Sequence, residues 1–193
     1  MADDYRFSAV LGEVLGGFSV ALGSSYGIHA DVNAPYMTKL TTEEQRERWL
    51  EPLLDNKIVS CFSMTEPAPG AGSDPSMLRT EARRTDAGWV INGRKHFITH
   101  GAEADYVILF AVTDPGKGAR GGISCFLVDT DSPGFEVGRR QRTMYDEHQA
   151  ELVFTDCRVG EDALLVHDAT RTVDLLARHE APRVVIRSGA VQR

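Results

Sequence analysis

The sequence predicts an α+β protein, with an antiparallel β-barrel or β-sandwich middle domain flanked by truncated all-α domains. Three observations support this: apolar residues recur at helical spacing near the N-terminus, short apolar runs fill the middle, and a helical pattern returns after Leu165. No helical pattern separates the short runs, which favours antiparallel pairing. We expect three domains: the end of a helical domain at 1–57, a β domain at 58–163 and the start of a second helical domain at 164–193.

Residues 6 to about 40 are expected to be helical, and Pro35 suits the first turn of a short helix. A further helix should begin after Thr42, which stands three residues before Gln45 in a capping-box pattern. Pro52 interrupts that helix, so it should be short or kinked. The apolar repeat of the first segment is made by Val10, Leu11, Val14, Leu15 and Phe18.

The middle of the chain alternates short apolar runs with turn residues. Asp86–Gly88 and Asn92-Gly93 are typical of hairpin turns. After Leu165 the helical pattern breaks at Pro182. The expected strands are Ile58–Met64, Leu78–Thr85, Trp89–Ile91, Lys95–Thr99, Tyr106–Val112, Gly122–Val128 and Glu151–Cys157.

Composition excludes several classes of function. With 42% hydrophobic and 25% charged residues, the chain resembles an ordinary soluble globular protein, and its net charge of −7 argues against nucleic-acid binding. No apolar run approaches the roughly 20 residues that span a bilayer. The acidic N-terminus lacks a signal-peptide pattern, so we expect a cytoplasmic protein. Cys61, Cys125 and Cys157 lie in apolar runs and are expected to be buried thiols.

Two sequence motifs lack the neighbouring secondary structure that their usual binding functions need. Gly116, Gly118 and Gly121 spell G-x-G-x-x-G, but the following segment reads as a strand rather than the helix that a dinucleotide site needs, so a hairpin loop is expected. His96 and His100 are four residues apart in a strand and turn, where that spacing does not form a metal pair, and no metal is expected.

The stretch from Cys61 to Thr99 carries the strongest functional pattern. An apolar strand ends at Thr65, a glycine- and proline-rich turn with Gly72 leads to Ser73, and a later strand ends in Phe97-Ile98-Thr99. Proline and glycine between strands often form only a turn. However, glycine lets a backbone approach a phosphate and a hydroxyl can donate to it, so a flat, phosphate-bearing cofactor is the functional interpretation.

The strings FSMTEP, GAGSD, NGRKHFIT and AELVFTDCRV, in this order, resemble the acyl-CoA dehydrogenase family. The resemblance implies a flavoprotein of fatty acid and lipid metabolism, with FAD bound between a middle β domain and a C-terminal helical bundle. It implies α,β-dehydrogenation of an acyl-CoA thioester, a CH–CH donor, with hydride transfer to FAD. It also implies an electron-transfer partner and a homo-oligomer for the full-length protein.

Carried over residue by residue, the resemblance assigns some residues to the flavin ring and Ser73 to the cofactor phosphates. The Thr65 hydroxyl is expected near the pyrimidine edge of the flavin, Thr99 near N5, and Phe97 against the ring in place of the family's usual tryptophan. Ser73 is expected near the cofactor phosphates and the acyl-CoA substrate. The full expected cofactor-binding set is Phe62, Ser63, Met64, Thr65, Gly72, Ser73, Phe97, Ile98 and Thr99.

The chain departs from the family pattern in three places. The loop after Thr65 has two extra residues, Ala68-Pro69 or a neighbouring pair. The family's catalytic carboxylate lies in the C-terminal bundle, which is almost wholly missing here, as are the first N-terminal helices. The segment after Leu165 lacks the family's glycine-rich start. Glu180 is the one candidate for the base, and its alternative is an ordinary surface carboxylate.

Three functional hypotheses follow. The first is an FAD-dependent acyl-CoA dehydrogenase or a fragment of one. The second is a truncated or degenerate member without turnover, whose exposed apolar faces would cause self-association. The third is a related flavin oxidase or monooxygenase, which differs from the first in residues that the sequence does not contain.

Overall fold

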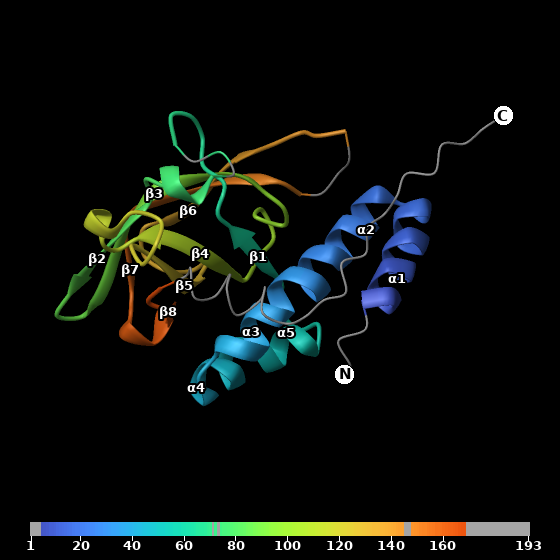
Figure 1. Ribbon diagram of the computed structural model, residues 1–193, viewed down its shortest axis with the longest axis horizontal. Coiled ribbons are helices and arrows are strands. Elements are labelled where there is room, and N and C mark those ends of the chain that lie inside the picture. Colours follow the sequence, from blue (N-terminus) through green and yellow to red (C-terminus); the bar gives the residue numbers. More distant parts are fainter. Residues whose placement is uncertain (1–4, 71, 73, 145–147, 169–193) are drawn as a thin grey trace.

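The computed structural model describes residues 5–70, 72, 74–144 and 148–168. Five α-helices precede an eight-stranded sheet (Figure 1). The helices are α1 Tyr5–Phe18, α2 Val20–Tyr26, α3 Ala34–Leu40, α4 Glu43–Gln45 and α5 Glu51–Leu54. The strands are β1 Ser60–Ser63, β2 Glu81–Thr85, β3 Gly88–Ile98, β4 Tyr106–Val112, β5 Ile123–Asp129, β6 Phe135–Arg140, β7 Ala150–Val159 and β8 Leu164–Val166.

The N-terminal helices follow the sequence prediction closely. The capping box is confirmed, because the Thr42 hydroxyl accepts from the Gln45 N–H and the Gln45 side chain accepts from the Thr42 N–H. The expected interruption before Pro52 is a π-helical turn at Arg46–Leu50. A second π-helical turn, Gly27–Asn33, joins α2 to α3.

The predicted middle domain was an antiparallel β-barrel or β-sandwich, and the sheet observed is mixed and open. Its strands follow the order β6-β7-β3-β2-β4-β5-β8, and β1 pairs with β4 in parallel. The segment with the β2–β3 hairpin supplies the long connection that a parallel pair such as β1 and β4 needs. A single residue pair, Glu81 with Val112, joins β2 to β4. Within the part of the chain described, no pairing joins β6 to β8, so the closed barrel is not confirmed while the α+β class is.

Two strand predictions need correction. Asn92-Gly93 is not a hairpin turn, since β3 passes through it with a shift of register against β7. The Asn92 amide donates to the Asp156 carboxylate over 3.1 Å and its oxygen accepts from the Asp156 N–H over 2.8 Å, which fixes this bulge. β6 was not predicted from the sequence, because five of its six residues are exposed and it has no apolar run.

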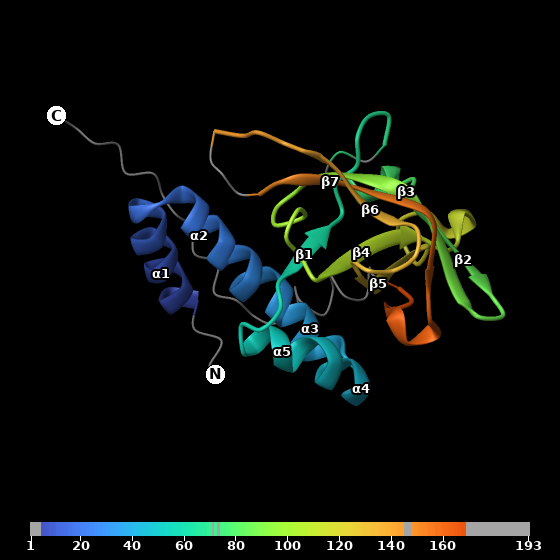
Figure 2. The same ribbon diagram turned by 180° about the vertical axis from the view of Figure 1, so that it is seen from behind.

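Two apolar clusters lie on opposite faces of the central strands. On one face, α3, α5 and the π-helical turn before α5 cover β4 and β5 with Met37, Trp49 and Leu50. On the other face, β4 and β5 pack against β3 and β7 through residues such as Leu109 and Phe126. β4 is therefore buried on both faces, and the fold consists of a helical layer and two strand layers (Figures 1 and 2).

The expected glycine-rich loop and the buried cysteines are confirmed. β4 and β5 form an antiparallel pair around the glycine-rich segment, which is a loop with a short 3₁₀ turn at Pro115–Lys117 and not a dinucleotide fingerprint. All three cysteines are free and fully buried. Among the helices described, none is both long and apolar enough to span a bilayer. The helical pattern beyond residue 168 and its Glu180 lie outside the described residues.

Candidate functional site

The ends of β1 and β3 lie side by side. The backbone N–H of His96 donates to the carbonyl oxygen of Thr65 over 2.9 Å. This contact brings together the two segments that the sequence predicted to carry hydroxyl donors, although they are separated by the whole loop and the β2–β3 hairpin. Thr65 and Thr99 are both half-buried.

A bulge at the end of β3 turns Phe97 outward. The pairing of β3 with β7 shifts between Lys95 and Ile98, and Phe97 has a φ of 55°. Bulges of this kind redirect side chains and are common beside active sites. The Phe97 N–H donates to the Gln141 side chain over 2.7 Å, and the Phe97 side chain is 54% exposed. A large aromatic ring is thus held in solvent beside the two threonines.

Four other predicted residues pack into the protein. The side chains of Ser63 and Ile98 are almost fully buried, so only their backbone groups could contact a cofactor. Phe62 packs on the helical side, with its ring 4.9 Å from Phe110 and 5.5 Å from Tyr36. Met64 also packs against this cluster while half-buried.

The loop between β1 and β2 starts at the site and folds back on itself. Its Ala68–Pro69 peptide bond is cis, in the place where the sequence has two extra residues. The carbonyl oxygen of Gly72 accepts from the Glu66 N–H over 3.2 Å. Gly72 has a φ of 50° with open space where a Cβ would stand, so it suits close approach of a ligand. Ser73 lies outside the described residues.

A buried ion pair that lies behind this face was not predicted from the sequence. The Lys95 ammonium lies 2.9 Å from the Glu66 carboxylate, and their side chains are 0% and 3% exposed. Burial lowers the pKa of Lys95 to about 8, although Glu66 opposes this shift. Burial would raise the pKa of Glu66, but Lys95 and the hydrogen bonds to Thr80 and Lys95 outweigh it, and the pKa is lowered. The lysine gave no signal of burial, because lysine is rarely buried without a partner and its partner Glu66 lies 29 residues away in the chain.

Two glutamines also support the face and were not predicted. Gln141 binds the Phe97 backbone, and the Gln149 amide donates to the Thr99 hydroxyl over 3.4 Å. Both come from the edge formed by β6 and β7, which carries few apolar residues at this end. Their role depends on tertiary contacts that no local pattern encodes.

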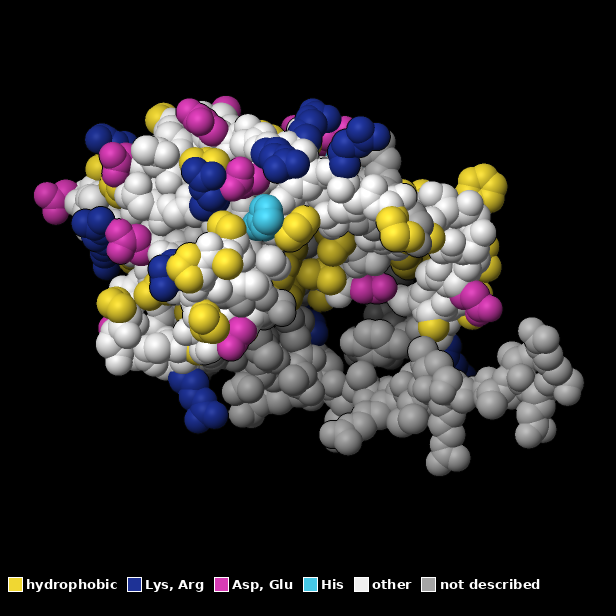
Figure 3. Space-filling view, turned by 90° about the horizontal axis from the view of Figure 1, so that it is seen from above, with side chains coloured by type: hydrophobic (Ala, Val, Ile, Leu, Met, Phe, Trp, Pro, Cys, Tyr) yellow, Lys and Arg dark blue, Asp and Glu magenta, His cyan; other side chains and the backbone are white. Residues whose placement is uncertain are grey.

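Exposed apolar side chains lie on the N-terminal helices as well as at Phe97. Viewed from above, hydrophobic side chains gather over α1 and α2 and along the hollow between these helices and the sheet (Figure 3). Phe7, Val14 and Phe18 on α1 are 70%, 62% and 87% exposed. Apolar area of this extent is typical of an interaction surface.

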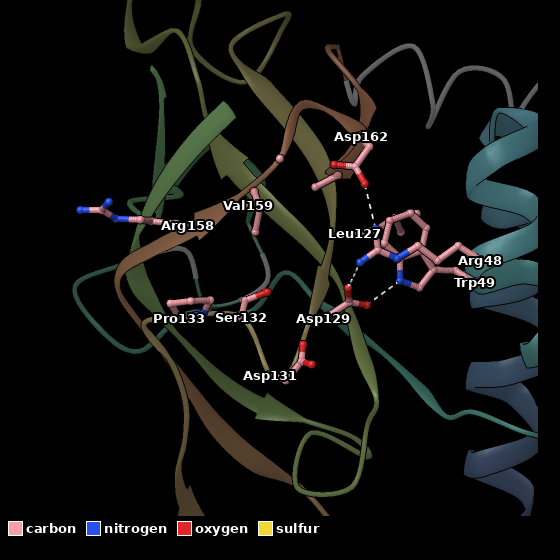
Figure 4. Close-up of a pocket in the computed structure, with 12 residues that line it drawn as sticks. Arg48, Trp49, Leu127, Asp129, Asp131, Ser132, Pro133, Arg158, Val159 and Asp162 are labelled. Carbon is pink, nitrogen blue, oxygen red and sulfur yellow. Dashed lines mark hydrogen bonds and ion pairs between the residues drawn. The ribbon is translucent and has the colours of Figure 1, made fainter. Parts of the chain in front are cut away.

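A cavity of about 350 Å³ lies elsewhere, where the helices meet the sheet (Figure 4). The Trp49 indole N–H donates to Asp129 over 2.7 Å, and Arg48 bridges Asp129 and Asp162. Arg158 points away from this group in the view. None of the predicted flavin residues lines the cavity, and the bonds of Arg48 and Trp49 to Asp129 and Asp162 connect the helices to the sheet there, so we interpret it as a structural contact between the two layers.

The comparisons with known proteins agree with this arrangement. The family model for the acyl-CoA dehydrogenase middle domain matches residues 61–157, and the model for the acyl-CoA dehydrogenase N-terminal domain matches residues 1–57. The first match contains the ends of both β1 and β3.

Individual relatives extend the match. The chain is 39% identical over 151 residues to a mitochondrial long-chain specific acyl-CoA dehydrogenase of Mus musculus, which covers 77% of this chain and 35% of that protein. An acyl-CoA dehydrogenase structure from Geobacillus kaustophilus has a TM-score of 0.80 at 32% identity, covering 90% of this chain and 46% of that one. A glutaryl-CoA dehydrogenase from Mycobacterium smegmatis in complex with FADH2 has a TM-score of 0.70 at 32% identity, and the match covers 79% of this chain and 38% of that one.

The chain therefore spans less than half the length of these relatives. Within that span the two family models match residues 1–57 and 61–157. The chain belongs to the acyl-CoA dehydrogenase family, a family of FAD-dependent oxidoreductases.

Proposed function

We propose that the protein takes part in the α,β-dehydrogenation of an acyl-CoA thioester. We also propose that the ends of β1 and β3, with Thr65, Phe97 and Thr99, form the side of its site that binds the flavin, which we call the flavin wall. The observation that carries the proposal is the bond between the Thr65 and His96 backbones, which brings the end of β1 beside the segment that carries Phe97 and Thr99. An electron-transfer protein would then remove the electrons. Assembly into a homo-oligomer and a cytoplasmic location remain predictions of the sequence.

The donor set fits FAD. Thr65 and Thr99 offer neutral O–H donors, Phe97 offers an exposed aromatic surface, and Gly72 offers open backbone for a phosphate. When bound, FAD supplies the acceptor for the β-hydride of the substrate. The hydroxyls of Thr65 and Thr99 are proposed to donate to its pyrimidine edge and N5, because prearranged donors stabilise charge as it develops there. Ser73 is proposed to bind the cofactor phosphates and the acyl-CoA.

The base that removes the α-proton is not provided by the described part of this face. Glu66 is its nearest carboxylate, but one oxygen accepts from Lys95 and the Thr80 N–H, and the other accepts from the Arg79 N–H. An occupied, buried carboxylate with a lowered pKa is a poor general base. We therefore propose a base from outside the described residues, with Glu180 as the candidate within this chain.

Dehydrogenation of an acyl-CoA series tests the proposal. The chain is purified, loaded with FAD and mixed with short-, branched- and long-chain acyl-CoA and an artificial electron acceptor. Reduction of the acceptor that requires both FAD and acyl-CoA is the expected result. Bound flavin without any reduction supports the inactive member instead, and peroxide formation from oxygen without the acceptor supports the flavin oxidase.

A Glu180→Gln variant separates the base from the flavin wall. If Glu180 is the base, the variant keeps its flavin and loses reduction of the acceptor. Unchanged reduction in that variant contradicts the assignment of Glu180 and leaves the flavin wall unaffected.

A further inference from the structure

The Lys95–Glu66 pair joins the two segments of the proposed flavin wall from behind. Lys95 lies on β3, two residues before Phe97, and Glu66 directly follows Thr65. The Lys95 ammonium donates to the Glu66 carboxylate over 2.9 Å and to the carbonyl oxygen of Met64 over 3.1 Å. One cation therefore binds the backbone on one side of Thr65 and the side chain on the other.

Glu66 in turn holds the far end of the loop. Its carboxylate accepts from the Arg79 N–H over 2.8 Å and from the Thr80 N–H over 2.9 Å. Its own N–H donates to Gly72 in the middle of the loop. Gly70 packs so closely that a Cβ there would stand 2.9 Å from the carboxylate. The start, middle and end of the loop are thus fixed around a single residue, Glu66.

We propose that Lys95 and Glu66 are positioning residues that hold the β1–β2 loop against β3, so that the donors of the flavin wall keep one arrangement. This inference rests on the proposed function for the part that concerns flavin. Neither side chain reaches a ligand, because both are buried. They act through Thr65, through Gly72 and through the start of β2.

A buried ion pair is poor evidence for stability alone. Two charges lose their hydration when they are buried, and apolar replacements of similar size are often as stable. The Lys95–Glu66 pair instead satisfies three backbone groups at defined places, two N–H groups and one carbonyl oxygen. That directional role predicts a loss of loop geometry that is distinct from a loss of global stability.

Amide hydrogen exchange tests the loop in the apo protein. The variants are Lys95→Met and the double variant Glu66→Gln/Lys95→Met, which removes both buried charges together and keeps the proposal testable if the single variant does not fold. We expect exchange at the amides of His96, Arg79 and Thr80 to accelerate by about tenfold or more in the folded variants. Amides of the β4–β5 hairpin should keep their protection. Unchanged exchange at those three amides overturns the proposal.

FAD titration tests the consequence for the flavin. In the folded double variant we expect the dissociation constant for FAD to rise by about tenfold or more and the visible circular dichroism of bound flavin to change. A purely structural role would leave both unchanged once the protein is folded, and that result overturns the positioning role even if the loop amides exchange faster.

Matched controls use exposed ion pairs. Lys57→Met removes a lysine that pairs with Asp55, and Glu81→Gln removes a carboxylate that pairs with Arg83. Both variants should keep the exchange pattern and the FAD affinity. If the unsubstituted chain binds no FAD, the proposed function is contradicted, while the exchange experiment still decides whether the pair fixes the loop.

Discussion

His96 donates its backbone N–H to the carbonyl oxygen of Thr65 over 2.9 Å, and this bond sets the geometry of the proposed flavin wall. It places the end of β1 beside the end of β3, the two segments that carry Thr65 and Thr99. The bond involves only backbone atoms, so side-chain substitutions at this face can test ligand binding with limited damage to the fold.

Replacing either threonine with valine should weaken FAD binding. Thr65→Val and Thr99→Val preserve shape but remove a donor, and each should cost about 1 kcal/mol of binding free energy, or roughly fivefold in affinity. Equilibrium titration of FAD measures this. Thr155→Val, at an exposed position of β7, is the control and should bind FAD as the unsubstituted chain does. Unchanged affinity in both site variants contradicts the assigned donors.

Phe97→Ala should separate binding from stability. The side chain is 54% exposed, so its loss should change the free energy of unfolding by less than about 0.5 kcal/mol. Its affinity for FAD should fall, because an aromatic surface is lost. Phe126→Ala is the contrast: this ring is fully buried between the strand layers, and its loss should cost about 3–5 kcal/mol. Denaturant unfolding and FAD titration measure the two effects, and a large stability loss in Phe97→Ala would argue that its ring packs in the core.

Gly93→Ala tests the bulge in β3. A Cβ at this position would stand 2.5 Å from the Thr80 hydroxyl and 2.6 Å from the Thr80 Cα, and the φ of 152° disfavours any side chain. We expect a loss of about 2 kcal/mol or more in the free energy of unfolding. Gly12→Ala in α1, where nothing lies within 4 Å of the new Cβ, should instead stabilise by about 0.5–1 kcal/mol. Equal effects at the two glycines would show that β3 does not pass close to Thr80.

The loss of folding stability at acid pH should depend on Glu66. Its pKa is lowered in the folded protein, so below the unfolded value the unfolded chain binds more protons than the folded one. The contribution of Glu66 to stability is therefore complete above about pH 4.5 and is lost as the pH falls through the lower folded pKa. Denaturant unfolding from pH 6 to pH 3 should show a shallower acid loss in Glu66→Gln than in the unsubstituted chain. Identical slopes would mean that the pKa of Glu66 is the same in the folded and the unfolded chain.

The sequence predicted those features that are encoded locally. Thr42 and Gln45 form the predicted cap, since a capping box needs only residues three apart. The apolar run at Tyr106–Val112 is the central strand. The Asn92-Gly93 prediction was wrong because contacts with Asp156 and Thr80 convert a turn-forming pair into a bulge.

The candidate site was predicted in part for the same reason. Thr65, Phe97 and Thr99 were found at strand ends because strand ends are visible in the pattern. The burial of Lys95 and its pairing with Glu66 were not, because they depend on the loop closing over β3. β6 was also missed, since a strand with an exposed face and charged residues lacks apolar alternation.

Equilibrium binding of FAD to the purified 193-residue chain tests the central claim most directly. The chain and the Thr65→Val/Thr99→Val double variant are titrated with FAD and followed by flavin fluorescence, and the folded state of each is checked by tryptophan fluorescence. We predict saturable binding to the unsubstituted chain, with flavin bands that survive desalting, and a marked loss of affinity in the folded double variant. No saturable binding to the folded unsubstituted chain, or equal binding by both proteins, would contradict the assignment of the Thr65–Thr99 face as the flavin wall.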